Sequence, residues 1–121
     1  MTVPTTPTDA RRTGTELTMS TAFELLADRH RRLALYCLSN RVEAITRVDL
    51  AAEIANRLDG PNDDLVEHIG IRLHHSHLPR LDEVDVVRYD PDVDRVQSGP
   101  ALTTLEPFLE LARAEERSTV A

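Results

Sequence analysis

The sequence predicts a mainly α-helical fold with one small antiparallel β-hairpin, and three observations point to this class. Several segments repeat apolar residues at spacings of three and four, the pattern of a helix with one buried face. Residues 86–89 and 95–97 are short strand-like segments around an acidic turn at 90–94, as in a hairpin. The chain has 121 residues, of which 3% are aromatic, so we expect a single domain with an aliphatic core.

The chain divides into a folded segment and two ends. Residues 1–19 are rich in Thr and Pro and are predicted to be a disordered tail. Residues 20–117 carry the periodic segments and form the predicted domain, and residues 118–121 are predicted to be flexible. Cys37 is the only cysteine, so an internal disulfide is excluded. Its position on an apolar face predicts a buried, unreactive thiol.

The first predicted helix covers about 20–39. Thr21 followed by Glu24 has the spacing of a capping box at its start. Asn40 can end the helix in a left-handed conformation. The buried stripe of this helix is predicted to consist of Phe23, Leu26, His30, Leu33 and Cys37.

Two more helices are predicted in the middle of the chain. Residues 44–45 form an apolar stub that can pair as a short strand, and Thr46 with Asp49 caps a helix of about 47–58. A Gly-Pro pair stops this helix, and the next one starts near Asp63. The predicted inner faces are Leu50, Ala51, Ile54 and Leu58 in one helix, and Val66, Ile69, Leu73 and His77 in the other.

Pro79 is expected to kink or break the third helix, because proline cannot donate to the helical ladder and clashes with the preceding turn. A change of direction there would turn Leu78 and Leu81 into the core. The predicted core therefore combines residues from four segments, namely Leu33, Ile54, Leu73, Leu78, Leu81 and Val86.

A last helix is predicted at about 103–117, with Pro107 in or near its first turn, where proline is tolerated. Its apolar stripe has two possible uses. The stripe can fold back onto the first helix of a monomer, or it can pair with a second copy. We expect a homodimer whose interface is Leu105, Phe108, Leu109 and Ala112.

The charge composition is unusual, because 14 Arg and no Lys stand against 21 acidic residues, a net charge of −7. Molar salt would screen the resulting self-repulsion over about 3 Å. We therefore expect a halophilic archaeon as the source, and an acidic protein of another GC-rich organism is the alternative. No apolar run can span a bilayer and the N-terminus lacks a signal-peptide core, so a cytoplasmic location is expected.

Four segments carry a resemblance to a known family. They are Arg29–Leu33, Leu50–Ala51, His75–Leu81 and Val86–Asp90. Together they resemble a haloarchaeal winged helix-turn-helix family of uncharacterised function, whose members are usually taken to be transcriptional regulators. The similarity covers about 20–112. The chain departs from the family at Asp85, where relatives usually carry Gly, but Asp tolerates a left-handed backbone better than most residues.

The resemblance implies a winged helix-turn-helix fold, which places its recognition helix in the major groove of DNA. Arg72, His75 and Ser76 would then reach base edges, and Arg95 of the hairpin would contact phosphate. We therefore expect a DNA-binding transcriptional regulator. The alternative is a protein–protein interaction module without DNA contact, because residues 59–99 hold four Arg and ten acidic residues, which phosphate would repel at low salt.

The histidines of the third helix have a functional and a structural interpretation. His74 and His77 stand three residues apart and could share a metal, but a zinc site needs three or four ligands, so we expect no metal. His77 is instead expected to pack in the core with a hydrogen bond, while His75 meets solvent or a ligand.

Arg29, Arg31 and Arg32 form a basic cluster that could touch phosphate. We expect instead a solvated face that pairs with Glu24 and Asp28. The sequence contains no Gly-rich phosphate loop, nucleophile elbow or zinc-protease motif, so we expect neither an enzyme nor a cofactor.

Overall fold

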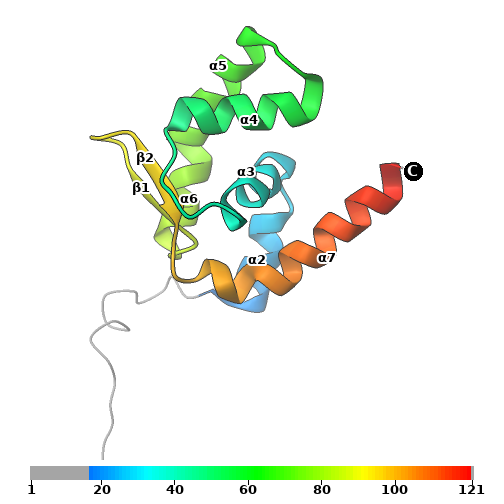
Figure 1. Cartoon of the computed structure of the whole chain (residues 1–121). Helices are drawn as coiled ribbons and strands as arrows, with labels where there is room; N and C mark the ends of the chain where they lie inside the picture. Colours follow the sequence, from blue (N-terminus) through cyan, green and yellow to red (C-terminus); the bar gives the residue numbers. More distant parts are fainter. Residues whose placement is uncertain (1–16, 121) are drawn as a thin grey trace, which may run out of the picture.

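The computed structural model describes residues 17–120, with side chains described up to Arg117, so most of the predicted tail lies outside the described residues. Helices surround the core and a two-stranded hairpin lies along one side (Figure 1). The elements in chain order are α2 (Met19–Leu26), α3 (Arg29–Ser39), α4 (Arg47–Asp59), α5 (Asp63–Arg72), the π-helical turn η1 (Leu73–His77), α6 (Leu78–Glu83), β1 (Val87–Asp90), β2 (Arg95–Ser98) and α7 (Leu102–Val120).

The single first helix predicted at 20–39 is wrong, because the chain breaks after α2 and restarts as α3 at Arg29. The Asp28 side chain caps α3 by accepting a hydrogen bond from the Arg31 N–H at 3.1 Å. Two guanidinium groups then satisfy carbonyls at the end of α2. Arg31 donates to the Leu25 carbonyl at 2.9 Å, and Arg32 donates to the Leu26 carbonyl at 2.6 Å.

The predicted ends of that helix also differ from the structure. Thr18, rather than Thr21, caps α2 by accepting a hydrogen bond from the Thr21 N–H at 3.1 Å. Asn40 follows α3 with a φ of −106°, which is outside the left-handed region. Phe23 is 57% exposed and His30 is half-buried, because the break turns α2 away from the line of α3.

The starts of α4 and α5 confirm their predicted positions. Thr46 caps α4 by accepting from the Asp49 N–H at 3.0 Å. Asn62 caps α5 by accepting from the Leu65 N–H at 3.0 Å. The two helices pack against each other and are joined by a short turn that contains Gly60 at a φ of 76°, a left-handed value that glycine adopts without strain.

Pro79 does not break the third helix, so the predicted break there is wrong, and the helix changes its hydrogen-bond pattern just before the proline instead. The chain stays helical from α5 through η1 to α6. The Leu78 N–H bonds to the Leu73 carbonyl five residues earlier, which places one extra residue in this turn. Pro79 therefore falls at the start of α6, directly after the ladder has shifted. This turn gives Leu78 and Leu81 the buried orientation that the sequence predicted.

The predicted hairpin is confirmed to within one residue at each strand. β1 and β2 pair antiparallel, with Val87 opposite Ser98 and Asp90 opposite Arg95. Ile45 extends the pairing, because its N–H and carbonyl each bond to Val96 at 2.8 Å. The predicted stub therefore pairs with β2 on the side opposite β1.

The turn between α6 and β1 confirms the expectation for Asp85, whose φ is 65°. Gly99 lies directly against this turn. A Cβ atom at Gly99 would stand 2.3 Å from the Asp85 carbonyl oxygen, so this close approach of two backbones requires glycine.

The core lies between the helices and the inner face of the hairpin. All six residues predicted to form its centre are buried, namely Leu33, Ile54, Leu73, Leu78, Leu81 and Val86. Cys37 is also buried, and burial raises the pKa of its thiol to about 11. Among the described residues, no helix combines the length and apolar character needed to cross a membrane.

α7 packs against α2 and α3 of its own chain (Figure 1). Leu105 and Leu109 are fully buried there, so these two residues are not a dimer surface and their predicted interface role is corrected. Phe108 and Ala112 are only half-buried. The edge of the Phe108 ring meets the exposed Phe23 ring at a centroid distance of 5.7 Å.

His77 is buried in the core, as expected, but the hydrogen bond predicted for it is not formed. Neither ring nitrogen has a hydrogen-bond partner among the described residues. The nearest carboxylate is Asp28, at 3.8 Å from Nε2. Burial lowers the pKa of His77, and the Asp28 charge only partly opposes this effect. The folded protein therefore holds this ring neutral.

The free energy of unfolding should fall as the pH drops below about 6.5. The unfolded chain protonates His77 near its ordinary pKa of 6.5, whereas the folded chain resists protonation until a lower pH, so acid favours unfolding. His30, whose pKa burial also lowers, adds to this effect. Each histidine can cost up to about 1.4 kcal/mol per pH unit. Denaturant titrations between pH 7 and 5 measure this slope, which His77→Leu should reduce.

The matched control for this prediction is His75→Leu, which removes an exposed histidine from the same turn. Equal slopes for the wild type and His77→Leu would contradict the assignment, as would equal reductions in both variants.

Candidate nucleic-acid interface

The structure gathers three of the predicted site residues at one place. Arg72 ends α5, and His75 and Ser76 follow in the π-helical turn, with all three side chains exposed. His74 lies in the same turn and holds it to the hairpin, because its Nδ1 lies 2.7 Å from the hydroxyl of Tyr89 on β1. The contact between His74 and Tyr89 therefore fixes the exposed turn against β1.

Arg95, the fourth predicted site residue, lies on β2 beside the hairpin turn, where it is exposed opposite Asp90. It thus belongs to a different element from Arg72, His75 and Ser76. A partner that contacted all four residues would have to bind the helix and the hairpin together.

Arg47 is a positioning residue that the sequence pattern did not indicate. Its backbone N–H donates to the Asp94 carboxylate of the hairpin turn at 2.9 Å, and its guanidinium donates to the Gly70 carbonyl of α5 at 3.0 Å. One residue therefore connects the start of α4, the C-terminal part of α5 and the hairpin. Only the folded chain brings these positions together, because Arg47 and Asp94 are 47 residues apart.

Several acidic side chains of the hairpin region serve the fold itself. Asp94 faces the N-terminus of α4, where a negative charge is favourable. Asp82 accepts the Tyr89 N–H at 2.8 Å, and Asp90 accepts the Asp92 N–H at 3.1 Å. Only some of the carboxylates in this segment are therefore free of contacts within the fold and able to interact with a partner.

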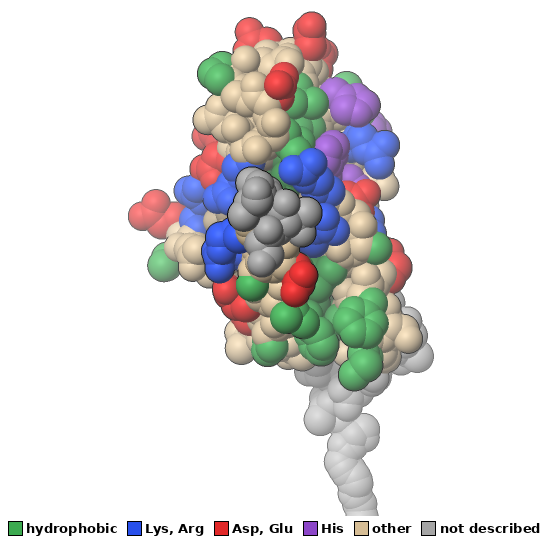
Figure 2. All heavy atoms as spheres, turned by 90° about the vertical axis from the view of Figure 1, so that its right-hand side faces the viewer, with side chains coloured by type: hydrophobic (Ala, Val, Ile, Leu, Met, Phe, Trp, Pro, Cys, Tyr) green, Lys and Arg blue, Asp and Glu red, His purple; other side chains and the backbone are tan. Residues whose placement is uncertain are grey.

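The exposed side of α5 lies next to the beginning of α3. Burial lowers the pKa of His30, and the charges of Arg72, His68 and Arg29 lower it further against the opposing effect of Asp28. The charges of Arg72 on α5 and Arg29 on α3 therefore both act on the His30 ring. In Figure 2 the His side chains lie together at the upper right, with Arg side chains beside them and acidic side chains mainly above and around.

The start of α5 has the opposite character. Asp63, Asp64 and Glu67 are exposed on its first turns. They suit the helix N-terminus electrostatically. They would repel a phosphate backbone, however, so the positive part of this helix is its C-terminal end.

The basic cluster at the start of α3 is divided between two roles. Arg31 forms an ion pair with Glu24 at 3.4 Å, as expected, while Arg32 pairs with Glu116 of α7 at 3.3 Å instead of with Asp28. Arg29 has no hydrogen bond or ion pair with any residue in the described part of the chain. Of this cluster, Arg29 is therefore the residue left for an external anion.

The histidines do not assemble a metal site in the described part of the chain. There, no group of three or more His, Cys, Asp or Glu side chains could hold an ion. His74 is directed to Tyr89, whereas His77 is buried.

The elements and this surface define a mainly α-helical protein with a small antiparallel sheet. The chain belongs to the DUF7344 family, described as a domain of unknown function, and the match covers residues 23–97. The matched region runs from α2 to β2 and leaves out α7. No curated protein and no solved structure matches the chain.

Proposed function

We propose that this protein is a winged helix-turn-helix transcriptional regulator that binds DNA in the cytoplasm of a halophilic archaeon. In this assignment α4 and α5 are the helix-turn-helix, α5 with η1 is the recognition helix, and β1 with β2 is the wing. The observation that carries the proposal is the exposed group Arg72, His75 and Ser76 beside the positive side chains at the start of α3. Guanidinium and hydroxyl groups suit base edges.

The charge of the chain fits this proposal best in concentrated salt. The net charge of −7 would oppose DNA binding in dilute buffer, whereas molar KCl screens repulsion beyond about 3 Å. Close contacts made by Arg72 would still act at that range. Direct base readout would then contribute more to affinity than long-range attraction.

Selection of bound fragments from genomic DNA in molar KCl tests the proposal. A recurrent sequence among the recovered fragments would support it. The matched control is Arg72→Glu, which should recover no such sequence while retaining the helical circular dichroism of the wild type. Failure to enrich any sequence, in molar KCl and again at lower salt, would contradict DNA binding.

The second candidate function is a winged-helix module that binds another protein. The exposed acidic residues Asp63, Asp64 and Glu67 at the start of α5 favour it, because they suit a basic partner. The same selection separates the two functions, since an interaction module would recover fragments at random.

We also propose a homodimer, built on an apolar patch rather than on the predicted stripe of α7. The patch is centred on Phe23 and Phe108 in edge-to-face contact, and the neighbouring helical turns add Met19 on α2 and Leu111 on α7, which are both 64% exposed. Aromatic side chains dominate interface energetics. A two-fold axis there would present two recognition helices, which regulators space about 34–36 Å apart.

Phe108→Asp should therefore convert a dimer into a folded monomer, as measured by sedimentation equilibrium in molar KCl. The control is Val93→Asp, which places the same charge on an exposed apolar position of the hairpin turn and should leave the dimer intact. A wild type that is already monomeric at micromolar concentration would contradict the dimer.

A further inference from the structure

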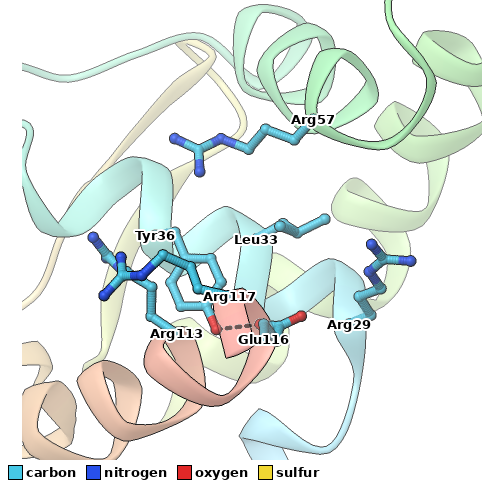
Figure 3. A pocket seen from close by; sticks show the side chains of 7 residues that line it. All are labelled: Arg29, Leu33, Tyr36, Arg57, Arg113, Glu116 and Arg117. Carbon is cyan, nitrogen blue, oxygen red and sulfur yellow. Dashed lines mark hydrogen bonds between the residues drawn. The ribbon is translucent and has the colours of Figure 1, made fainter. Parts of the chain in front are cut away.

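A pocket of about 560 Å³ lies between three elements that are distant in the sequence. α3 forms its floor, α4 lies above it and the end of α7 closes one side (Figure 3). Its lining consists of Arg29, Leu33 and Tyr36 from α3, Arg57 from α4, and Arg113, Glu116 and Arg117 from α7.

The pocket concentrates positive charge in a protein whose net charge is −7. Four of its seven lining residues are Arg, and Glu116 is its single acidic residue. Figure 2 shows the same feature from outside, as Arg side chains placed around the end of α7. The guanidinium groups around this pocket repel one another, and a bound anion would relieve that repulsion.

The carboxylate of Glu116 is already used within the fold. The Tyr36 hydroxyl donates a hydrogen bond to it, and Arg32 donates from outside the pocket at 3.3 Å. Burial works to raise the pKa of Glu116, but these two groups outweigh that effect and keep the carboxylate ionised. The Arg29 charge also helps to hold this pKa down, but one carboxylate cannot balance the four guanidinium groups that line the pocket.

The four pocket arginines differ in how far the fold already uses them. Within the described residues, Arg29, Arg57 and Arg117 form no hydrogen bond or ion pair. Arg113 is held in place, because its guanidinium lies 4.7 Å from the centre of the Tyr36 ring and donates to Ser39 at 3.2 Å. The pocket thus combines one fixed guanidinium with three that face solvent.

We propose that this pocket binds a small phosphorylated ligand. The planar guanidinium fork matches phosphate oxygens in bidentate fashion, and several forks together suit a doubly charged phosphate ester. Leu33 and the Tyr36 ring offer an apolar floor for the uncharged part of such a ligand. The pocket volume lies in the range of about 300–1,000 Å³ that small-molecule sites occupy. This proposal does not depend on DNA binding.

Phosphate can also come from the DNA backbone, so the experiment must separate the two sources. Isothermal titration calorimetry in molar KCl would use adenosine 5′-monophosphate as the probe, with unphosphorylated adenosine and a short DNA duplex as further titrants. We expect heat from the monophosphate and none from adenosine. Arg57→Ala and Arg117→Ala should each weaken monophosphate binding about tenfold, with duplex binding unchanged.

The matched control is Arg88→Ala, which removes an exposed guanidinium from β1 and the same unit of charge. It should leave monophosphate affinity unchanged, and circular dichroism checks that all variants fold. An absence of monophosphate binding would overturn the proposal. Equal weakening by Arg88→Ala, or binding of the duplex alone through Arg57 and Arg117, would also overturn it.

Discussion

Replacing Leu78 by Ala should lower the free energy of unfolding by about 2–5 kcal/mol, the range for truncating a fully buried leucine. Leu78 has no exposed surface and lies in the core with Leu73 and Leu81, which are also fully buried. The lost stability has two sources, the apolar surface that is no longer buried and the cavity that the shorter side chain leaves. A domain of this size is stable by only about 5–15 kcal/mol, so the variant loses a large part of its margin. Denaturant unfolding in molar KCl measures the change.

Ile71→Ala is the control for Leu78→Ala, because Ile71 lies on the same continuous helix but is 51% exposed. Substitutions at exposed positions usually change stability by less than about 0.5 kcal/mol. A loss below about 1 kcal/mol in Leu78→Ala would mean that the π-helical turn does not direct this side chain into the core.

Under the proposed DNA-binding function, Arg72→Ala should weaken binding to the selected site by about 1–3 kcal/mol and relax the base preference at one position, as loss of a bidentate base contact does. Arg95→Ala should weaken binding evenly across sequences, because a phosphate contact carries no sequence information. Fluorescence anisotropy with the selected duplex and single-base variants measures both effects.

The control for these substitutions is Arg41→Ala, which removes the same charge after the end of α3, where the guanidinium pairs with Glu53. It should leave affinity and base preference at the wild-type level. If Arg72→Ala lost affinity equally for all sequences and kept the base preference, Arg72 would contact phosphate and not a base. If Arg41→Ala lost as much affinity, the loss in Arg72→Ala would reflect the change in net charge and not a specific contact.

The hairpin and the middle helices could be predicted because local patterns determine them. Thr46 and Asn62 cap their helices through bonds to the third following residue, which are visible in sequence. The break at Ala27–Asp28 was not predicted, because apolar spacing continues across it without Gly or Pro, and its one local signal is the Asp28 cap on the Arg31 N–H. What separates α2 from α3 is a pair of guanidinium–carbonyl bonds over six residues, from Arg31 and Arg32.

The exposed group Arg72, His75 and Ser76 followed from the helical period, but its surroundings did not. The pocket beside α7 joins residues as far apart as Arg29 and Arg117, and only the path of α7 brings them together. The sequence left two paths open for that helix. An apolar stripe shows which residues seek burial but not whether their partners belong to the same chain.

The extra residue in the π-helical turn between Leu73 and Leu78 has an evolutionary consequence. A homologue that lacked one residue of this turn would close it as ordinary α-helix and keep both flanking stretches in phase. Such a deletion elsewhere in α5 would rotate every later side chain by about 100° and expose Leu81. His74, His75 and Ser76 therefore occupy a site where insertion and deletion can remodel the surface without disturbing the interior. Single-residue gaps in an alignment of this family should accumulate there.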